Sequence, residues 1–544
     1  MTSIPTNAVH LILASLWVGG MLAFLIAVFA ATGKRAHENA KWFGVQTLKR
    51  LSAMVLLVLV TVFVTGLMVA DRMVAQKYAT VFVSHYGWLL ITKLAMLFVI
   101  LVIALRMHRV WLPALGRNPE ATAVAKRKLR RWVTIEGVFA LALVLAATLM
   151  ANTHPPNHVT IHDWPYPFRF DIAGTWGMGM QDVMIRVWVG AGVLTLAAGS
   201  VALGRAKRWE PKWRLAIPLT LTVCALVVGL PALTVPAFPE TYRPTPIPFE
   251  VKSIARGMTL FAANCVPCHG PQGKGNGVLA KTLPKQPVDL LTEPHASMHT
   301  PGDFFHWLTY GMPGTGMPAW GEKFSKNERW DLVNLIHAIS RGYQARLTNP
   351  RVLPDQPYLA PPDFYYTTHE GTTGRLKDSS RQNAVLLVVF SWPESRGRLD
   401  ELKSSYAALS SRKTEVLLVP MSNLDQKELE AVLRDTPFPV VTQGAAEIVR
   451  TYSLFRRTIT NPDIMGEATV PKHMEFLFDR FSYLRARWIP EADGAGWTDI
   501  ELLTQQVDQL NQEKEILPPP GDYVHDTSGG MMHDMSGGMG GMRM

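Results

Sequence analysis

Six apolar stretches of about twenty residues each lie within the first 234 residues of the chain. A helix of that length spans the ~30 Å hydrocarbon core of a bilayer, because it rises ~1.5 Å per residue. Six such segments in succession are not expected in a water-soluble domain, so we predict a six-helix transmembrane bundle over residues 1–234. Its helices are expected at about 8–31, 51–70, 87–105, 132–151, 183–203 and 215–233.

Basic residues are distributed unevenly over the segments between these stretches. The segments after the first, third and fifth stretches hold 18 Lys and Arg, whereas those after the second and fourth hold three. Because cytoplasmic loops carry the excess of positive charge, the N-terminus and everything after residue 233 are expected in the periplasm of a bacterium. The positive charge thus belongs to the cytoplasmic rim of an inner-membrane domain, which makes lipid a predicted partner and excludes nucleic acid.

His and Met residues recur at the predicted outer ends of the stretches. Imidazole accepts either oxidation state of copper and thioether favours Cu(I), so this set indicates a copper-binding rim. A functional role is favoured for the ionisable groups inside a span, because they are costly there. The alternative is that the histidines are interfacial anchors and the methionines pack. The set consists of His10, His154, His158, His162, Met178 and Met180, with Lys93 inside the third stretch.

Two runs in this region, HLILASLWVGGMLAFLIA and YGWLLITKLAMLFVILVIAL, are similar to a known family. They resemble the CopD family of membrane copper-resistance proteins over about residues 5–230. The resemblance implies that the membrane domain handles copper. The broader group also resembles small membrane proteins that bind haem through a His in the first helix, so a b-type haem on His10 is the alternative. The matching residues are His10, Trp17, Gly19, Gly20 and Lys93.

A haem-attachment motif follows the last apolar stretch. After the Pro-rich segment 235–250, which is expected to be an extended linker, the chain continues to Cys265-Val-Pro-Cys268-His269. This is the signature of c-type haem attachment, in which two thiols bond to the porphyrin vinyl groups and the imidazole ligates the iron. A zinc site is the alternative, but the one other cysteine, Cys224, lies inside a span, so no sufficient ligand set can be assembled. We predict one covalent haem c.

The second axial ligand of the iron is expected further along, where Met312 and Met317 precede an amphipathic helix pattern. Residues 250–345 resemble class I cytochromes c, which place this ligand in a Met-Pro-aromatic turn before their final helix. The resemblance favours Met317 over Met312 and implies an all-α cytochrome c domain at 251–345. Ligation by His269 and a methionine leaves no open site on the iron, which favours electron transfer over oxygen chemistry.

Residues 382–515, beyond a second Pro-rich linker at 346–381, are expected to form an α/β domain. The runs AVLLVVFSW, TEVLLVPM and FPVVTQ are typical of buried strands, and a hairpin and a last helix near 499–513 follow them. This order resembles thioredoxin-like domains, with Val470-Pro471 at the position of their cis-proline. The run FSWPESRG contains no cysteine, so dithiol exchange is excluded.

Two further segments carry candidate copper ligands. The run HMEFLFDRFSYLRARW resembles a strand pair of Sco-type copper chaperones, which places His473 at their copper-ligand histidine. The two cysteine ligands of that family are absent here, so a structural or docking role is the alternative. The tail, residues 516–544, is low in complexity and is expected to be disordered; it has either no function or a role in binding Cu(I) through thioethers. Its candidate ligands are His525, Met531, Met532, His533, Met535 and Met539.

These parts indicate an electron carrier that handles copper rather than a hydrolase or transferase, because the sequence contains no recognisable nucleophile-base arrangement or phosphate loop. We predict a membrane-anchored, periplasmic monohaem cytochrome c that couples electron transfer to copper transport or homeostasis. Copper ions and a periplasmic electron donor or acceptor are its expected partners. Two alternatives stay open: a respiratory module that passes electrons from quinol to a cytochrome, and an assembly factor for a periplasmic or membrane copper enzyme.

Overall fold

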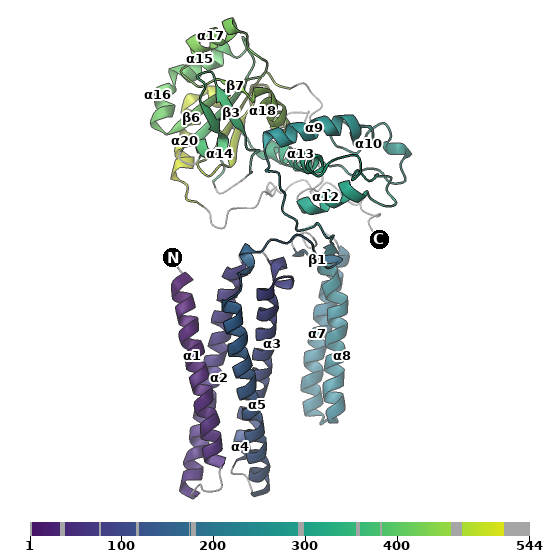
Figure 1. Cartoon of the computed structure of the whole chain (residues 1–544), viewed down its shortest axis with the longest axis vertical. Helices are drawn as coiled ribbons and strands as arrows, with labels where there is room; N and C mark the ends of the chain where they lie inside the picture. The colour runs from purple at the N-terminus through teal and green to yellow at the C-terminus, as the bar shows by residue number, and fades with distance from the viewer. Residues whose placement is uncertain are drawn as a thin grey trace. The chain divides into compact units, whose positions relative to one another are not determined.

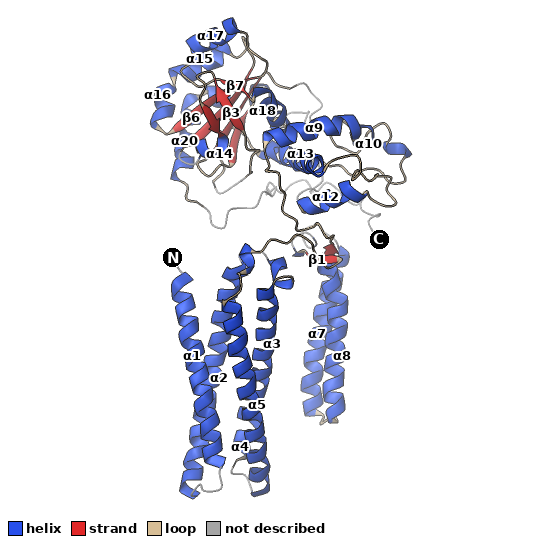
Figure 2. Cartoon of the chain, in the orientation of Figure 1, coloured by secondary structure: helices blue, strands red, loops and turns tan. Residues whose placement is uncertain are grey.

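The structure, a computed structural model, divides into two compact units, Met1–Arg169 and Phe170–Met544. The first unit is mainly helical, and the second contains both helices and strands, as Figures 1 and 2 show. The residues described are 3–32, 38–74, 78–115, 119–172, 175, 181–291, 299–354, 359–380, 383–457 and 470–515.

Long apolar helices make up the described part of the first unit, and shorter helical turns connect them (Figure 1). The long helices are α1 (Ser3–Thr32), α2 (Glu38–Val74), α3 (His85–Arg106) and α5 (Pro119–Ala151). The shorter elements are η1 (Tyr78–Phe82), the π-helix η2 (Met107–Trp111), α4 (Leu112–Ala114) and η3 (Pro156–His158).

The buried faces of these helices form two apolar clusters, which we name after one member each. The outward faces are apolar too: Leu11 on α1 is 66% exposed and Leu57 on α2 is 70% exposed. Apolar surface of this extent indicates contact with lipid rather than with water. The Trp17 cluster consists of Trp17, Met21, Val55, Leu59, Val62, Leu97, Ile100, Ala140 and Leu143. The Met107 cluster consists of Phe24, Val28, Leu48, Ile103, Met107, Leu112, Leu115, Ala125, Leu129 and Val133.

Two further apolar helices, α7 (Gln181–Ala206) and α8 (Pro211–Gly229), pack against each other in the second unit. Gly190 permits a close approach, since a Cβ there would lie 3.1 Å from the carbonyl oxygen of Ala225, and such small-residue contacts are typical of membrane helices. Short strands β1 (Phe168–Phe170) and β2 (Thr234–Pro236) flank the pair, and η4 (Leu230–Leu233) extends α8.

Within the described residues, six helices are long and apolar enough to cross a membrane, which confirms the predicted number. Four of them belong to the first unit, and α7 and α8 belong to the second.

A helical domain follows β2 and contains the haem motif. Its two longest helices, α9 and α13, cross closely because α9 carries Gly257: a Cβ there would lie 2.4 Å from the carbonyl oxygen of Asp331. The guanidinium of Arg256 also binds the Asp331 carboxylate, with Nε at 2.7 Å and Nη2 at 2.8 Å. The elements are α9 (Val251–Asn264), α10 (Val266–His269), η5 (Ala280–Thr282), α12 (Pro301–Tyr310), α13 (Lys326–Gln344) and η6 (Ala345–Leu347).

The rest of the second unit is an α/β domain. Its strands are β3 (Tyr365–Thr368), β4 (Thr373–Arg375), β5 (Ala384–Phe390), β6 (Thr414–Pro420), β7 (Val441–Gln443), β8 (His473–Phe478) and β9 (Leu484–Trp488). Its helices are α14 (Leu376–Ser380), α15 (Arg396–Ser404), α16 (Tyr406–Ser411), α17 (Gln426–Asp435), α18 (Ala445–Tyr452), η7 (Ser453–Phe455), α19 (Pro490–Asp493), η8 (Gly496–Thr498) and α20 (Ile500–Gln512).

The central sheet has the strand order β6-β5-β8-β9. Strands β5 and β6 are parallel, whereas β8 is antiparallel to both β5 and β9, as the predicted hairpin requires. Every residue of β5 is buried, and its side chains alternate between two apolar clusters, with Leu387 in one and Leu386 in the other. A strand covered on both faces reads as a continuous apolar run, and AVLLVVF is one. The domain is therefore thioredoxin-like in its layout.

Two sequence expectations for this domain need correction. Strand β7 pairs with β3 in the order β4-β3-β7, and the adjacent Val440 pairs in parallel with Leu418 of β6. Its partners β3 and β4, with α14, lie in residues 346–381, which the Pro-rich composition predicted to be a linker. The cis peptide bond lies at Trp392–Pro393, not at Val470–Pro471. Strands β3 and β4 were not predicted because they are only four and three residues long and lie in a segment rich in proline.

The helical and α/β domains contact each other within the second unit. Val251 of α9 and Ala345 of η6 belong to one of the two apolar clusters of the α/β domain. Gly342 of α13 lies against η7, since a Cβ there would be 2.4 Å from the carbonyl oxygen of Leu454. The domains therefore share a hydrophobic core over part of their boundary.

Candidate functional site

A single helical turn carries the predicted haem attachments. Helix α9 ends at Asn264, and the carbonyl oxygen of Cys265 accepts hydrogen bonds from the backbone N–H groups of Cys268 (3.1 Å) and His269 (2.8 Å). The turn ends at Gly270, whose φ of +73° favours glycine. A Cβ at this position would lie 2.1 Å from Oδ1 of Asn276. The local sequence thus fixes two thiols and one imidazole within five consecutive residues.

The environment of this turn suits a haem. Burial raises the pKa of the Cys265 thiol to about 11 and lowers the pKa of His269, so the imidazole is neutral, which is the form that ligates iron. Both cysteines are free thiols. Nδ1 of His269 is buried and has no hydrogen-bond partner. These free groups beside an apolar core fit a covalently attached haem.

The two candidate methionines lie at the two ends of one tight loop. The N–H of Met312 donates to the carbonyl oxygen of Met317 at 3.1 Å, and Thr315 Oγ1 donates to the carbonyl oxygen of Met312 at 2.7 Å. Met317 packs against the apolar core of the helical domain, as Cys265 does, whereas Met312 does not belong to that cluster. The packing thus supports Met317, although the choice of ligand stays a prediction.

The predicted copper rim is only partly brought together. Nδ1 of His10 lies 2.9 Å from Oγ1 of Thr65 on α2, and Lys93 on α3 is near enough to interact with His10 electrostatically. The other three histidines of the rim, His154, His158 and His162, are exposed. Among the described residues no three His, Cys, Asp or Glu side chains gather in a way that could hold a metal ion. Met178, Met180 and the tail at 516–544 lie outside the described residues, so these copper sites stay predictions.

His473 lies at the start of β8, and both of its ring nitrogens have partners. Nδ1 is 3.0 Å from Oγ of Ser395, and Nε2 is 2.8 Å from Oε1 of Glu475. Glu475 also accepts two hydrogen bonds from Arg398, at 2.7 Å and 3.0 Å. Copper could bind His473 only if one of these contacts broke. The geometry therefore supports the structural role that was the alternative.

Removing Arg398 is expected to destabilise the α/β domain strongly. Burial opposes ionisation of Glu475, but Arg398 and His473 hold its pKa at about 2. An Arg398→Met variant leaves this buried carboxylate without its main partner, so the free energy of unfolding should fall by about 3–5 kcal/mol. Urea-dependent proteolysis of the full-length protein measures this loss.

The exposed pair Lys472–Glu394, at 2.8 Å, provides the matched control for this experiment. A Lys472→Met variant should cost about 1 kcal/mol or less, and equal losses for the two variants would contradict the argument. The pKa of Glu475 lies below its ordinary value of 4.5. The stabilisation from the Arg398 pair is therefore complete above pH 4.5 and is lost as the pH falls toward 2.

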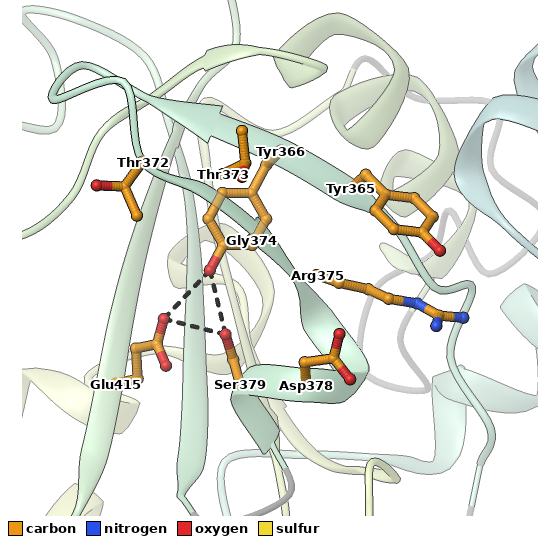
Figure 3. Close-up of a pocket in the computed structure, with 9 residues that line it drawn as sticks. All are labelled: Tyr365, Tyr366, Thr372, Thr373, Gly374, Arg375, Asp378, Ser379 and Glu415. Carbon is orange, nitrogen blue, oxygen red and sulfur yellow. Dashed lines mark hydrogen bonds between the residues drawn. The ribbon is translucent and has the colours of Figure 1, made fainter.

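A polar pocket of about 530 Å³ lies beside the β3–β4 hairpin (Figure 3). The hydroxyl groups of Tyr366 and Ser379 each donate to Oε1 of Glu415 at 3.2 Å. These bonds tie the hairpin and α14 to β6, which explains the polar residues there as structural. The lining residues are Tyr365, Tyr366, Thr372, Thr373, Gly374, Arg375, Asp378, Ser379 and Glu415.

Sequence reasoning missed one buried acid in the membrane unit, Glu136 on α5, which is 2% exposed. The sequence does contain a sign of this residue's importance, because Glu136 is the one acidic residue in the apolar stretch 132–151. The partners of His473 were missed as well. Ser395 lies 78 residues away in the chain, and only the pairing of β5 with β8 brings the two together.

Comparison with known proteins identifies two segments. Residues 45–150 match the family model of copper resistance protein D, and residues 252–336 match that of cytochrome c oxidase, cbb3-type, subunit III. Over 95 residues the chain is 30% identical to the cbb3-type cytochrome c oxidase subunit FixP of Azorhizobium caulinodans. That match covers 18% of this chain and 30% of the relative, so the chain spans less than a third of the relative's length.

Solved structures similar to part of the chain include a thioredoxin domain and a member of the Sco family. One is the thioredoxin domain of a thiol-disulfide oxidoreductase from Bacteroides vulgatus, with 15% identity over 28% of this chain and 98% of that one, at a TM-score of 0.22. The other is BsSco, a member of the Sco family of cytochrome c oxidase assembly proteins, with 14% identity over 30% and 99%, at a TM-score of 0.24. Scores this low carry no argument about function. The two family matches and the Cys265–His269 turn indicate a membrane cytochrome c linked to copper.

Proposed function

We propose that the chain is a cytochrome c anchored in the bacterial inner membrane that exchanges single electrons with copper handled by its CopD-like helices. The turn from Cys265 to His269 carries this proposal, because it presents two free thiols and a neutral imidazole, and because Cys265 and Met317 pack against the same apolar core. Copper changes between Cu(I) and Cu(II) by one electron, which is what a single haem carries. The unequal distribution of basic residues supports a periplasmic position for everything after residue 233.

The residues of the helical domain would each have a distinct role in electron transfer. A bound haem supplies a one-electron couple. Cys265 and Cys268 would hold it through thioether bonds, and His269 and Met317 would occupy both axial positions of the iron. Filled axial positions keep dioxygen away from the metal, and a methionine ligand raises the reduction potential. The short helix α10 would therefore orient the group, and the loop from Met312 to Met317 would supply the remaining ligand.

One preparation of the full-length protein tests this function. A reduced pyridine-haemochrome spectrum should show one haem c per chain, and metal analysis of the same sample should show bound copper. Adding Cu(I) anaerobically should reduce the haem, with one electron passing from each Cu(I) to the iron. A stoichiometric b-type haem with quinol-dependent reduction of haem c would instead support the respiratory alternative, and a sample without copper would exclude the copper role.

Replacing His10 is expected to lower the amount of copper bound by the membrane helices. His10 lies between α1 and α2 against Thr65, and a Cβ on Gly66 would lie 3.1 Å from its Cε1, so the imidazole is held in one place. A His10→Phe variant should lose copper, measured as copper per haem after dialysis. His85, an exposed histidine at the start of α3, provides the control, since His85→Phe should retain copper. Equal copper in both variants would remove His10 from the site.

A further inference from the structure

A carboxyl group is buried inside the first unit with one oxygen unpartnered. Glu136 lies in α5, within the candidate span Thr122–Ala151. It is 2% exposed, and its Oε2 has no hydrogen-bond partner. The other acidic residues of this unit whose burial the structure gives, Asp71, Glu120 and Asp163, are exposed. Because an ionisable group inside a span is costly to keep, such a residue usually marks a functional site.

Glu136 lies between the two apolar clusters of the bundle. It stands three residues after Val133 of the Met107 cluster and four residues before Ala140 of the Trp17 cluster. On α2, Ser52 occupies the corresponding interval, four residues after Leu48 of the Met107 cluster, and it is 7% exposed. Residues three or four apart share one helix face. Glu136 and Ser52 therefore form a polar layer between two apolar ones.

A third polar residue, His108, reaches the same layer from η2. Trp111 of η2 stacks on Trp132 of α5 with ring centroids 5.7 Å apart. Because α3 and α5 run in opposite directions, the turn before Trp111 lies level with the turn after Trp132, which places His108 level with Glu136. Nδ1 of His108 is 3.2 Å from Oγ of Ser52. The element that carries His108 is a π-helix, a form that is frequent at functional sites.

We propose that Glu136 is a proton-binding site in the core of the first unit, and that His108 and Ser52 form the route by which its proton exchanges with water. A proton fits this place because a neutral carboxyl group tolerates burial without a counter-ion, whereas a carboxylate does not. A metal ion fits less well, since the described residues hold no group of three His, Cys, Asp or Glu side chains. His108 is partly exposed, and its imidazole both accepts and donates protons.

The other ionisable groups on the packed helices leave Glu136 without a counter-ion. His10 of α1 bonds Thr65, and Lys93 of α3 lies near His10. On α5 itself, Nε of Arg130 donates to Oγ1 of Thr32 at 2.8 Å. Of the basic residues of α2 and η2 whose burial the structure gives, Lys49, Arg50, Arg72 and Arg109 are exposed. On α5, Arg127, Lys128 and Arg131 are exposed and Lys126 is partly exposed. Arg106 of α3 lies over Trp111. The acidic Asp71 and Glu120 are exposed as well.

Infrared spectroscopy of the full-length protein in lipid vesicles tests the proton site directly. The wild type at neutral pH should show the carbonyl stretching band of a protonated carboxyl group, and this band should shift in D₂O. The band should vanish in Glu136→Gln, which keeps the size of the side chain. It should persist in Glu120→Gln, which removes an exposed carboxylate from the same helix. A spectrum unchanged by Glu136→Gln would overturn the proposal, because Glu136 would then be ionised.

The proposed exchange route is tested by the rate at which the carboxyl band shifts after the protein is transferred to D₂O. A His108→Phe variant should exchange roughly 10²-fold more slowly than the wild type, the lower end of what a positioned proton-transfer group supplies. An unchanged rate would remove His108 from the route. Should Glu136→Gln fail to insert, Glu136→Asp is the second variant. It retains a carboxyl group and should keep a band at an altered frequency, and the absence of any protonated band in it would count against the site. None of these measurements depends on haem or copper, so their outcome is separable from that of the proposed function.

Discussion

Replacing both Cys265 and Cys268 with Ala is expected to abolish covalent haem attachment completely. The backbone bonds at 3.1 Å and 2.8 Å from Cys265 hold the two thiols and His269 in one turn, and each thioether needs its own sulfur. Without them only axial ligands could retain the group, and those do not survive denaturation. Haem staining after denaturing electrophoresis measures the loss.

Cys224 offers the matched control for this double variant. It is an exposed thiol on α8, outside the helical domain, so Cys224→Ala should keep its haem stain unchanged. Retention of the stain in the Cys265→Ala, Cys268→Ala protein would show that the haem is held elsewhere, and the helical domain would lose its assigned role. Membrane insertion of each variant is checked by its yield in the membrane fraction.

Met317→Ala is expected to lower the reduction potential of the haem by roughly 0.2 V, a quarter of the ~0.8 V range over which axial ligands tune haem iron. Met317 packs on the core that also contacts Cys265, and a thioether ligand raises the potential. The methionine-to-iron charge-transfer band in the oxidised spectrum should vanish together with the high potential. Potentiometric titration of the purified protein measures the shift.

Met312→Ala is the natural comparison, because Met312 lies at the other end of the same loop and its N–H bonds the carbonyl oxygen of Met317. This backbone bond survives the substitution, so the band and the potential should stay close to those of the wild type. If Met312→Ala lost the band and Met317→Ala retained it, the ligand assignment would be reversed. Loss of the band in both variants would indicate that the conformation of the loop, rather than one methionine sulfur, determines iron ligation.

The sequence predicted best those features that depend on neighbouring residues. Six apolar helices follow from twenty-residue stretches, and the haem turn follows from five consecutive residues. Strand β5 was predicted because all seven of its residues are apolar, and the structure shows all seven buried. In each case the chemistry of a short window is enough to fix the local structure.

Features that depend on distant partners were not predictable in this way. Strand β7 lies in the predicted strand run FPVVTQ, but its pairing with β3 involves a segment whose prolines indicated a linker. Glu136 was overlooked because one acidic residue hardly changes the mean hydropathy of a twenty-residue apolar stretch. The contact of His473 with Ser395 and that of Glu475 with Arg398 exist only after β5 and β8 pair, which no single-sequence pattern reveals.

The shared core between the helical and α/β domains bears on how electrons are delivered. A cytochrome domain on a flexible linker diffuses within the reach of that linker and so encounters its partners by its own motion. With Val251 and Ala345 inserted among the side chains of the α/β domain, and Gly342 lying against Leu454, the haem-binding segment loses that freedom. Under the proposed function, a redox partner would therefore meet the helical domain and the cysteine-free domain together, as one composite surface.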